Sequence, residues 1–257
     1  CISVVGIYYF IRDICEWRKL LNSLNPDYKL PGWSDLKICL ACSPIFIFIK
    51  VFLNKYLIIF CSKIMKETYR NPKNDEDRKL AKKYKAKLPD HLIKISFYTF
   101  ITILGFILLR NLEYFPKSLL GNGYFPNILR EGYPGCFFHT RPKYFDFYYM
   151  LALSFFSVDS IFFFFQEKQS DYINMLLHNI VTIRLHFFSY YTNISNVGCV
   201  VLYLHILTDI FVHLTRFFLQ TDVPEIIKSA IGIILVFVYM YVRIYVLGDV
   251  IYTIWAY

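Results

Sequence analysis

The sequence predicts an all-α integral membrane protein, a bundle of at least six transmembrane helices around a central cavity. Two observations carry this prediction. Of the 257 residues, 56% are hydrophobic and 20% are aromatic, which excludes an ordinary soluble domain. Several apolar stretches also reach the roughly 20 residues that a helix needs to cross a bilayer, where its backbone must satisfy its own hydrogen bonds.

Residues 1–35 are predicted to be an interfacial segment or a truncated span. The apolar stretch ISVVGIYYFI is too short to cross a bilayer, and a charged run follows it. The chain begins at Cys1 without the order of features that marks a signal peptide, so we expect the full protein to extend further upstream. The first complete span is predicted at 36–62, where Pro44 is tolerated.

Residues 63–91 are predicted to form a basic cytosolic loop. The segment KIMKETYRNPKNDEDRKLAKKYKAK at 63–87 holds ten Lys or Arg against four Asp or Glu. Basic connectors between spans stay in the cytosol, opposite anionic headgroups. The same charge could contact a ribosome, but we expect no direct binding to nucleic acid.

Residues 92–257 are predicted to form the membrane core. The connector 111–143 is punctuated by glycines and prolines and cannot be regular helix, whereas the linker QEKQSD at 166–171 is short. Gly248-Asp249 is expected to end the sixth span, and VIYTIWAY to begin a seventh that the chain truncates. The five core spans are predicted at 92–110, 144–165, 172–191, 197–219 and 228–247.

Asn193-Ile-Ser195 is a glycosylation sequon between two of these spans. With residues 63–91 in the cytosol, alternation of the spans places the sequon in the lumen. It lies so close to both helix ends that we expect it to remain unmodified.

Two stripes of polar side chains run along the fourth and fifth spans. An ionisable group at bilayer depth costs about 2.5 to 3.5 kcal/mol or more, so it usually faces a cavity or a partner helix. A short linker joins these spans, which makes them antiparallel neighbours whose stripes can face each other. The stripes are His178, Thr182 and His186, and His205, Asp209, His213 and Arg216.

Three interpretations fit these stripes. Metal binding is the least favoured, because His205 and His213 lie about 12 Å apart along a helix and cannot share one ion, so we expect no metal. Acyl transfer is the second: a neutral imidazole acts as nucleophile or base, and a carboxylate stabilises the imidazolium. A polar network that joins two spans without chemistry is the third, and from the residues alone it is the most favoured.

From about Trp33 to its end, the sequence resembles the TLC-domain proteins, of which the ceramide synthases of the longevity-assurance type are members. The resemblance implies a multi-pass acyltransferase of the endoplasmic reticulum membrane. Such an enzyme joins the acyl group of acyl-CoA, its co-substrate, to a sphingoid base, needs no cofactor, and forms homo- or heterodimers. The matching positions run without a gap through His178, Ser189-Tyr190, Asn193, Gly198, His205 and Asp209.

The resemblance implies His178, Asp209 and His205 as the catalytic residues, with His178 holding or activating the acyl group. The chain departs from the family pattern at two positions: Asn179 replaces the second paired histidine, and Ile206 replaces an aspartate. Asn179 can donate a hydrogen bond but cannot shuttle a proton. The residues expected to contact substrate are Asn179, Thr182, Ser189, Tyr190, Asn193, His213 and Arg216.

A second branch of the same family offers an alternative. The spacing of His205, Asp209, His213 and Arg216 is similar to that of the translocating-chain-associated membrane proteins (TRAM), which are not enzymes. This resemblance implies a protein-conducting channel and the ribosome as partners. The acyltransferase remains the first interpretation, because the ungapped match through Gly198 is the more specific one.

Overall fold

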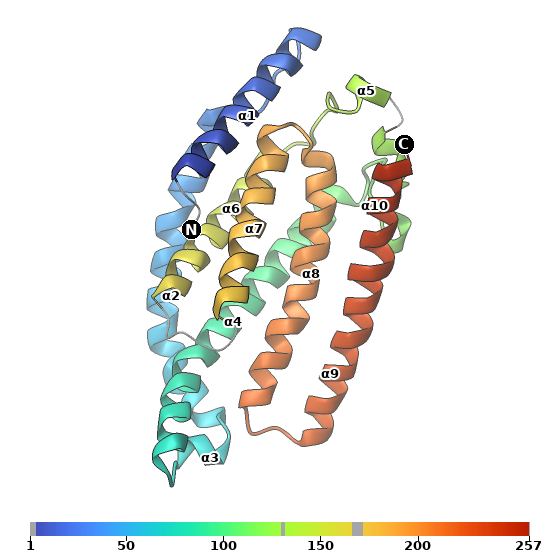
Figure 1. Cartoon of the computed structure of the whole chain (residues 1–257). Helices are drawn as coiled ribbons and strands as arrows, with labels where there is room; N and C mark the ends of the chain where they lie inside the picture. The colour runs from blue at the N-terminus through green and yellow to red at the C-terminus, as the bar shows by residue number, and fades with distance from the viewer. Residues whose placement is uncertain (1–3, 130–131, 166–171, 257) are drawn as a thin grey trace. The chain divides into compact units, whose positions relative to one another are not determined.

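The computed structural model describes residues 4–129, 132–165 and 172–256, so the predicted linker at 166–171 lies outside the described residues (Figure 1). Its regular elements are helices, as the sequence predicts. The short ones are η1 (Trp33–Asp35), α3 (Glu67–Arg70), η2 (Lys117–Leu119), η3 (Phe125–Leu129) and α5 (Gly132–Gly135). The long ones are α1 (Val4–Leu24), α2 (Leu36–Ile64), α4 (Asp75–Leu109), α6 (Phe145–Phe164), α7 (Tyr172–Tyr191), α8 (Ser195–Gln220), α9 (Glu225–Tyr239), the π-helix η4 (Met240–Val246) and α10 (Leu247–Ala256).

Within the described residues, five helical segments are long and apolar enough to cross a membrane, which establishes a multi-pass membrane fold. Helix α7 has the length of a crossing but is not among the five, because polar side chains such as Asn174, Asn179 and Arg184 interrupt its apolar sequence. The five segments are Trp33–Ile64, Asp75–Leu109, Phe145–Phe164, Ser195–Gln220 and Glu225–Ala256.

The prediction of a loop through residue 91 is wrong in its secondary structure, because α4 already begins at Asp75. Acidic residues fill its first turn, where they complement the helix dipole. The Lys-, Ala- and Leu-rich sequence that follows consists of strong helix formers. Pro89 lies inside the helix without ending it. Much of the basic segment therefore extends the second crossing as helix.

The prediction that the last crossing ends at Gly248-Asp249 is also wrong. The helix continues from Glu225 to Ala256 through the π-helical turn at Met240–Val246. A glycine inside a helix costs only about 1 kcal/mol. In an apolar environment, a broken helix would leave backbone groups without partners at a higher cost. Gly248 is consequently an ordinary residue within the helix and does not end it.

The chain divides into two compact units, and α2, α4, α8 and α10 each contribute to both. The first unit comprises Cys1–Ser43, Leu108–Leu202 and Thr253–Tyr257; the second comprises Pro44–Ile107 and Tyr203–Tyr252.

The core of the first unit lies around α6, whose residues Tyr148, Tyr149 and Met150 are fully buried. Helix α8 approaches this core closely at Gly198. A Cβ at that position would lie 2.3 Å from the hydroxyl of Tyr149 and 2.5 Å from that of Ser189. The close packing around this position therefore leaves room only for glycine.

In the second unit, Cys61 of α2, Leu88 of α4 and Phe217 of α8 form a buried core. Just beyond it, Met65 and Thr221 pair in an isolated antiparallel bridge. These contacts fix the end of α2 beside the end of α8.

Candidate functional site

The second unit contains a cluster of His205, Asp209 and Arg243. His205 and Asp209 lie one turn apart on α8, and their Nε2 and Oδ2 atoms are 3.3 Å apart. Arg243 comes from the π-helix η4: its Nη2 lies 2.9 Å from Nδ1 of His205 and 3.8 Å from Oδ1 of Asp209. Its Nε also donates to the Thr208 hydroxyl at 3.1 Å. The imidazole is thus held between a carboxylate and a guanidinium.

These partners determine the tautomer of His205. A guanidinium has donors only, so Nδ1 must accept the hydrogen bond from Arg243. The proton of the neutral ring then resides on Nε2, the nitrogen that lies 3.3 Å from the Asp209 carboxylate. The side chains of His205, Asp209 and Arg243 are 12%, 16% and 23% exposed, so the cluster is largely shielded from solvent but not sealed.

Arg243 is not among the residues that the sequence predicts for the site. It is a charged residue within an apolar helix, and an ionisable group at that depth is itself a signal of function. The π-helical turn is a second signal, because such turns are frequent at functional sites, although it emerges only from the structure.

A second polar cluster in the same unit joins α2, α4 and α8. The Asp90 carboxylate accepts from Lys50 at 3.0 Å and forms an ion pair with Lys94 at 3.2 Å. Nδ1 of His213 lies 3.1 Å from Nδ1 of His91, so one ring donates and the other accepts. Both rings are buried. His213, predicted to contact substrate, thus links α8 to α4, and Arg216 follows one turn further along α8.

In the first unit, His186 and Ser189 contact α6. Nε2 of His186 lies 2.8 Å from the Tyr149 carbonyl, and the two rings pack with their centroids 4.1 Å apart. The Ser189 hydroxyl lies 2.6 Å from that of Tyr149. His186 therefore turns its ring toward α6 and packs there.

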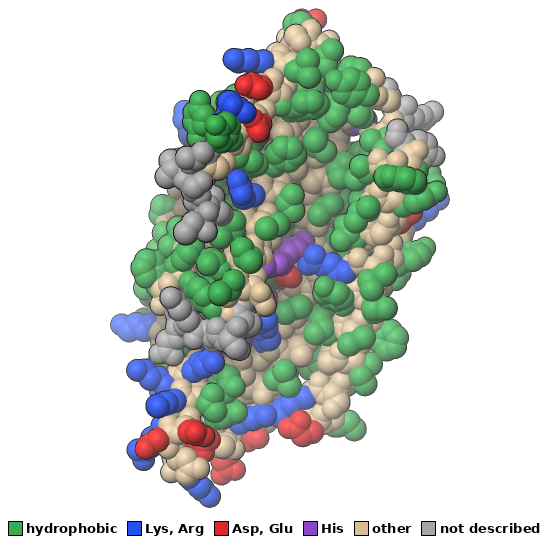
Figure 2. Space-filling view, viewed as in Figure 1, with side chains coloured by type: hydrophobic (Ala, Val, Ile, Leu, Met, Phe, Trp, Pro, Cys, Tyr) green, Lys and Arg blue, Asp and Glu red, His purple; other side chains and the backbone are tan. Residues whose placement is uncertain are grey.

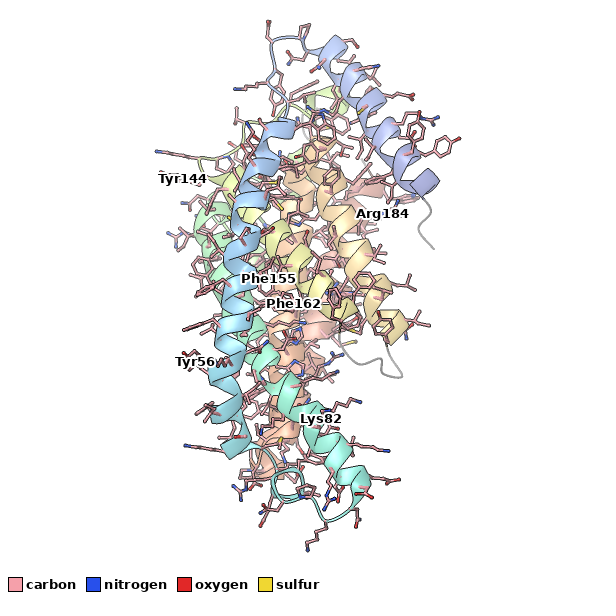
Figure 3. All side chains as sticks on the ribbon, turned by 90° about the vertical axis from the view of Figure 1, so that its left-hand side faces the viewer. Tyr56, Lys82, Tyr144, Phe155, Phe162 and Arg184 are labelled. Atoms are coloured by element: carbon pink, nitrogen blue, oxygen red, sulfur yellow. The ribbon has the colours of Figure 1, made fainter. Side chains whose placement is uncertain are left out.

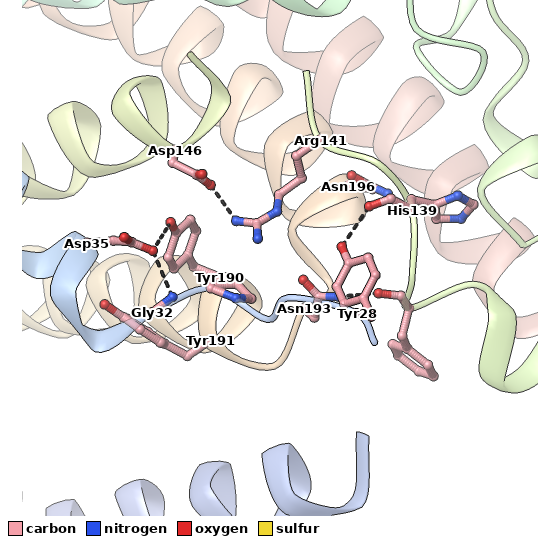
Figure 4. A network of polar contacts seen from close by, with 12 residues as sticks. Tyr28, Gly32, Asp35, His139, Arg141, Asp146, Tyr190, Tyr191, Asn193 and Asn196 are labelled. Carbon is pink, nitrogen blue, oxygen red and sulfur yellow. Dashed lines mark hydrogen bonds and ion pairs between the residues drawn. The ribbon is translucent and has the colours of Figure 1, made fainter. Parts of the chain in front are cut away.

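Tyr190 and Asn193 take part in a network that holds loops against the end of α7 (Figure 4). The Tyr190 hydroxyl donates to Asp35 at 2.9 Å, and the same carboxylate accepts from the Gly32 amide. The Asn193 side chain donates to the Phe137 carbonyl, which ties the connector down.

Two further contacts of this network fix the same connector. Tyr28 donates to the His139 carbonyl at 2.8 Å, and Arg141 pairs with Asp146 (Figure 4). Burial lowers the pKa of Arg141, but the charge of Asp146 outweighs this effect and raises the pKa above its usual value. The guanidinium thus remains charged at any physiological pH.

The remaining predicted site residues lie on α7 in the first unit. His178 is exposed, whereas Asn179 and Thr182 are partly buried. The structure thus brings His205 and Asp209 together within one unit. The role of His178 stays a prediction.

The helices and this partly shielded cluster of ionisable groups define a multi-pass membrane protein with a polar site among its helices. A family model for the TLC domain matches residues 87–257, more than half of the chain, and the chain belongs to the TLC-domain family. The predicted resemblance is thereby confirmed, although the match begins at Lys87 and not at Trp33. No curated protein matches the chain.

Proposed function

We propose that the chain is a divergent membrane N-acyltransferase of the ceramide-synthase type, which transfers a fatty acyl group from acyl-CoA to a sphingoid base. One observation carries the proposal: within the TLC domain, a neutral imidazole is oriented by a carboxylate and contacted by a guanidinium from another helix. Such a set can remove a proton and stabilise an oxyanion.

Amide formation requires three events, and the cluster offers a group for each. The amine nitrogen attacks the thioester carbon, the carbon–sulfur bond breaks, and the proton lost by the amine ends on the leaving thiolate. Nδ1 of His205 carries that proton, and Asp209 stabilises the imidazolium. Nδ1 becomes available only when Arg243 leaves it. A guanidinium that moves onto the thioester oxygen would release the base and stabilise the developing charge in one motion.

The family resemblance supplies the other roles in the proposal. His178 holds or activates the acyl group, and Asn179 donates to its carbonyl in place of the second histidine. The remaining substrate contacts in this proposal are Thr182, Ser189, Tyr190, Asn193, His213 and Arg216. Tyr190 and Asn193 form hydrogen bonds to Asp35 and to the Phe137 carbonyl. These bonds support an indirect role for both residues, in which they hold the connector in position.

The cellular setting belongs to the same proposal. The concentration of Lys and Arg at 63–87 supports a cytosolic position for residues 63–91, and the family resemblance favours the endoplasmic reticulum membrane. Helix α7 is the candidate for a sixth crossing because it has the required length. The resemblance further implies a cavity for the acyl chain and a homo- or heterodimer.

Turnover by the purified chain tests the proposal. In lipid nanodiscs supplied with palmitoyl-CoA and sphinganine, we expect an N-acyl product by mass spectrometry. His205→Ala and His178→Ala should each abolish it. His139→Ala, a histidine outside both stripes, controls for the loss of an imidazole. Absence of product from the wild-type chain with several acyl-CoA lengths would remove the acyltransferase.

A non-enzymatic, translocon-associated role is the second candidate. Two observations favour it: both nitrogens of His205 lie within 3.3 Å of charged side chains, and His213 pairs with His91 inside the helices. These are features of a network that joins helices. Gentle detergent purification from native membranes should then recover ribosomes and channel subunits. Their absence, together with turnover of acyl-CoA, would reject this candidate.

A further inference from the structure

A cavity of about 400 Å³ lies in the second unit, where α2 ends and α3 and α4 begin, outside the residues that the TLC-domain model matches. Its volume is within the range of small-molecule sites. The lining is Ser62, Lys63, Met65, Tyr69, Arg70 and Lys85.

Every charged side chain in this lining is positive. Lys63, Arg70 and Lys85 contribute three cations, and no carboxylate is part of the lining. Among the described residues, no ion pair within 4 Å joins any of the three to an acidic side chain. Figure 2 shows Lys and Arg side chains around this end of the unit, with Asp and Glu side chains among them. The cavity therefore attracts anions.

Packing contacts between the helices hold the walls of this cavity in place. Met65, 3% exposed, pairs with Thr221 in the antiparallel bridge. The Lys66 amide donates to the Gln220 carbonyl at 3.2 Å, which anchors the start of α3 to the end of α8. The Tyr69 ring packs on Tyr84 of α4 with centroids 4.7 Å apart. The walls are thus fixed by three helices.

We propose that this cavity binds a ligand carrying two or more closely spaced phosphate groups. A guanidinium binds phosphate with paired hydrogen bonds, and two lysines add point charges. Ser62 and Tyr69 supply hydroxyl groups. A tyrosine hydroxyl is protonated at neutral pH and can donate, and burial raises the pKa of Tyr69 further.

Two sources can present this chemistry. One source is a phosphorylated inositol lipid, because the cavity lies where the apolar sequence of α2 ends and a polar headgroup is expected. The phosphate end of coenzyme A is the other source. Gln220, beside the cavity, lies eleven residues along α8 from Asp209, or about 16 Å at 1.5 Å per residue. An extended pantetheine arm has a comparable length.

The experiment measures binding and needs no turnover, so its outcome is independent of the acyltransferase. The chain in nanodiscs is titrated with coenzyme A and, separately, mixed with vesicles that contain phosphatidylinositol bisphosphate or phosphatidylserine at equal total charge. We expect saturable binding of coenzyme A or a clear preference for the bisphosphate lipid. The arm that responds identifies the source.

A matched pair of variants tests the cavity itself. K63Q/R70Q/K85Q removes three charges from the lining, and K73Q/K79Q/K82Q removes three exposed charges from the same segment; Lys82 is labelled in Figure 3. We expect the first variant to weaken binding about tenfold or more and the second to leave it within about twofold. If the lining variant does not fold, K85E against K82E makes the same comparison. Equal weakening by both variants, or no saturable binding, would overturn the proposal.

Discussion

Histidines of the two units differ in what they bind. In the first unit, His139 and His186 each bind a backbone carbonyl. In the second, His205 and Arg243 bind other ionisable side chains. A side chain whose partner is a main-chain carbonyl positions the scaffold, because that partner cannot titrate. A side chain whose partners are ionisable can exchange protons and partners. This difference distinguishes framework residues, which hold the structure in place, from residues that could take part in chemistry.

Asp209→Asn provides the strongest test of this contrast. The amide keeps the shape of the side chain but removes the charge that stabilises an imidazolium. We expect turnover to fall about a thousandfold while the melting temperature changes little. Asp222→Asn, an exposed aspartate in the α8–α9 linker, serves as the control. A fall in both activity and melting temperature would place Asp209 in the framework instead.

Gly198→Ala tests the packing of the framework. The new methyl group would lie 2.3 Å from the Tyr149 hydroxyl, so helices must move apart. Overpacking of this kind costs about 1 to 3 kcal/mol, measured as the free energy of unfolding in mixed detergent. Gly232→Ala is the control, because nothing lies within 4 Å of the Cβ that it adds. Equal stability of the two variants would show that the close approach at Gly198 is absent.

Tyr190→Phe removes the hydrogen bond to Asp35 and should cost about 1 kcal/mol of unfolding free energy. Activity per folded molecule should remain unchanged if this tyrosine belongs to the framework. Tyr252→Phe, at an exposed position, controls for the loss of a hydroxyl. A larger effect on turnover than on stability would instead support the predicted contact of Tyr190 with substrate.

The smallest effect concerns the sequon at Asn193. When the chain is expressed in eukaryotic cells, we expect glycosidase treatment to cause no shift in its mass. Asn193 is 5% exposed, so its side-chain nitrogen, the atom that would carry a glycan, is inaccessible to the transferase. Tyr124→Thr creates a sequon at exposed Asn122 on the same connector. Modification at Asn122 alone would confirm both the lumenal side and the burial of Asn193.

Most of the helices could be predicted, because a bilayer allows few alternatives to a long apolar helix. The errors occur where a second influence competes with the apolar pattern. The charges of 75–91 suggest a loop, but the same residues are good helix formers. Gly248-Asp249 suggests an end, yet the apolar surroundings favour an unbroken helix.

The candidate site could be predicted only along single helices. The spacing of His205 and Asp209 places them in contact, as the structure confirms. Their third member, Arg243, lies 34 residues from Asp209 along the chain, and no periodicity connects them. In the same way, the His91 partner of His213 depends on which helices become neighbours. Pairings between distant helices follow from packing, which a single sequence does not record.

The π-helical turn has a consequence for how the last helix can vary. A π turn contains one residue more than the α-helical turn that it replaces. Deletion of a single residue within 240–246 would therefore restore regular winding and rotate everything on one side of it by about 100°. The apolar surface beyond Val246 and the guanidinium of Arg243 could then no longer both keep their present directions. The extra residue sets the rotation of one part of the helix relative to the other, so that a single helix can present a charged side chain inward and apolar side chains outward.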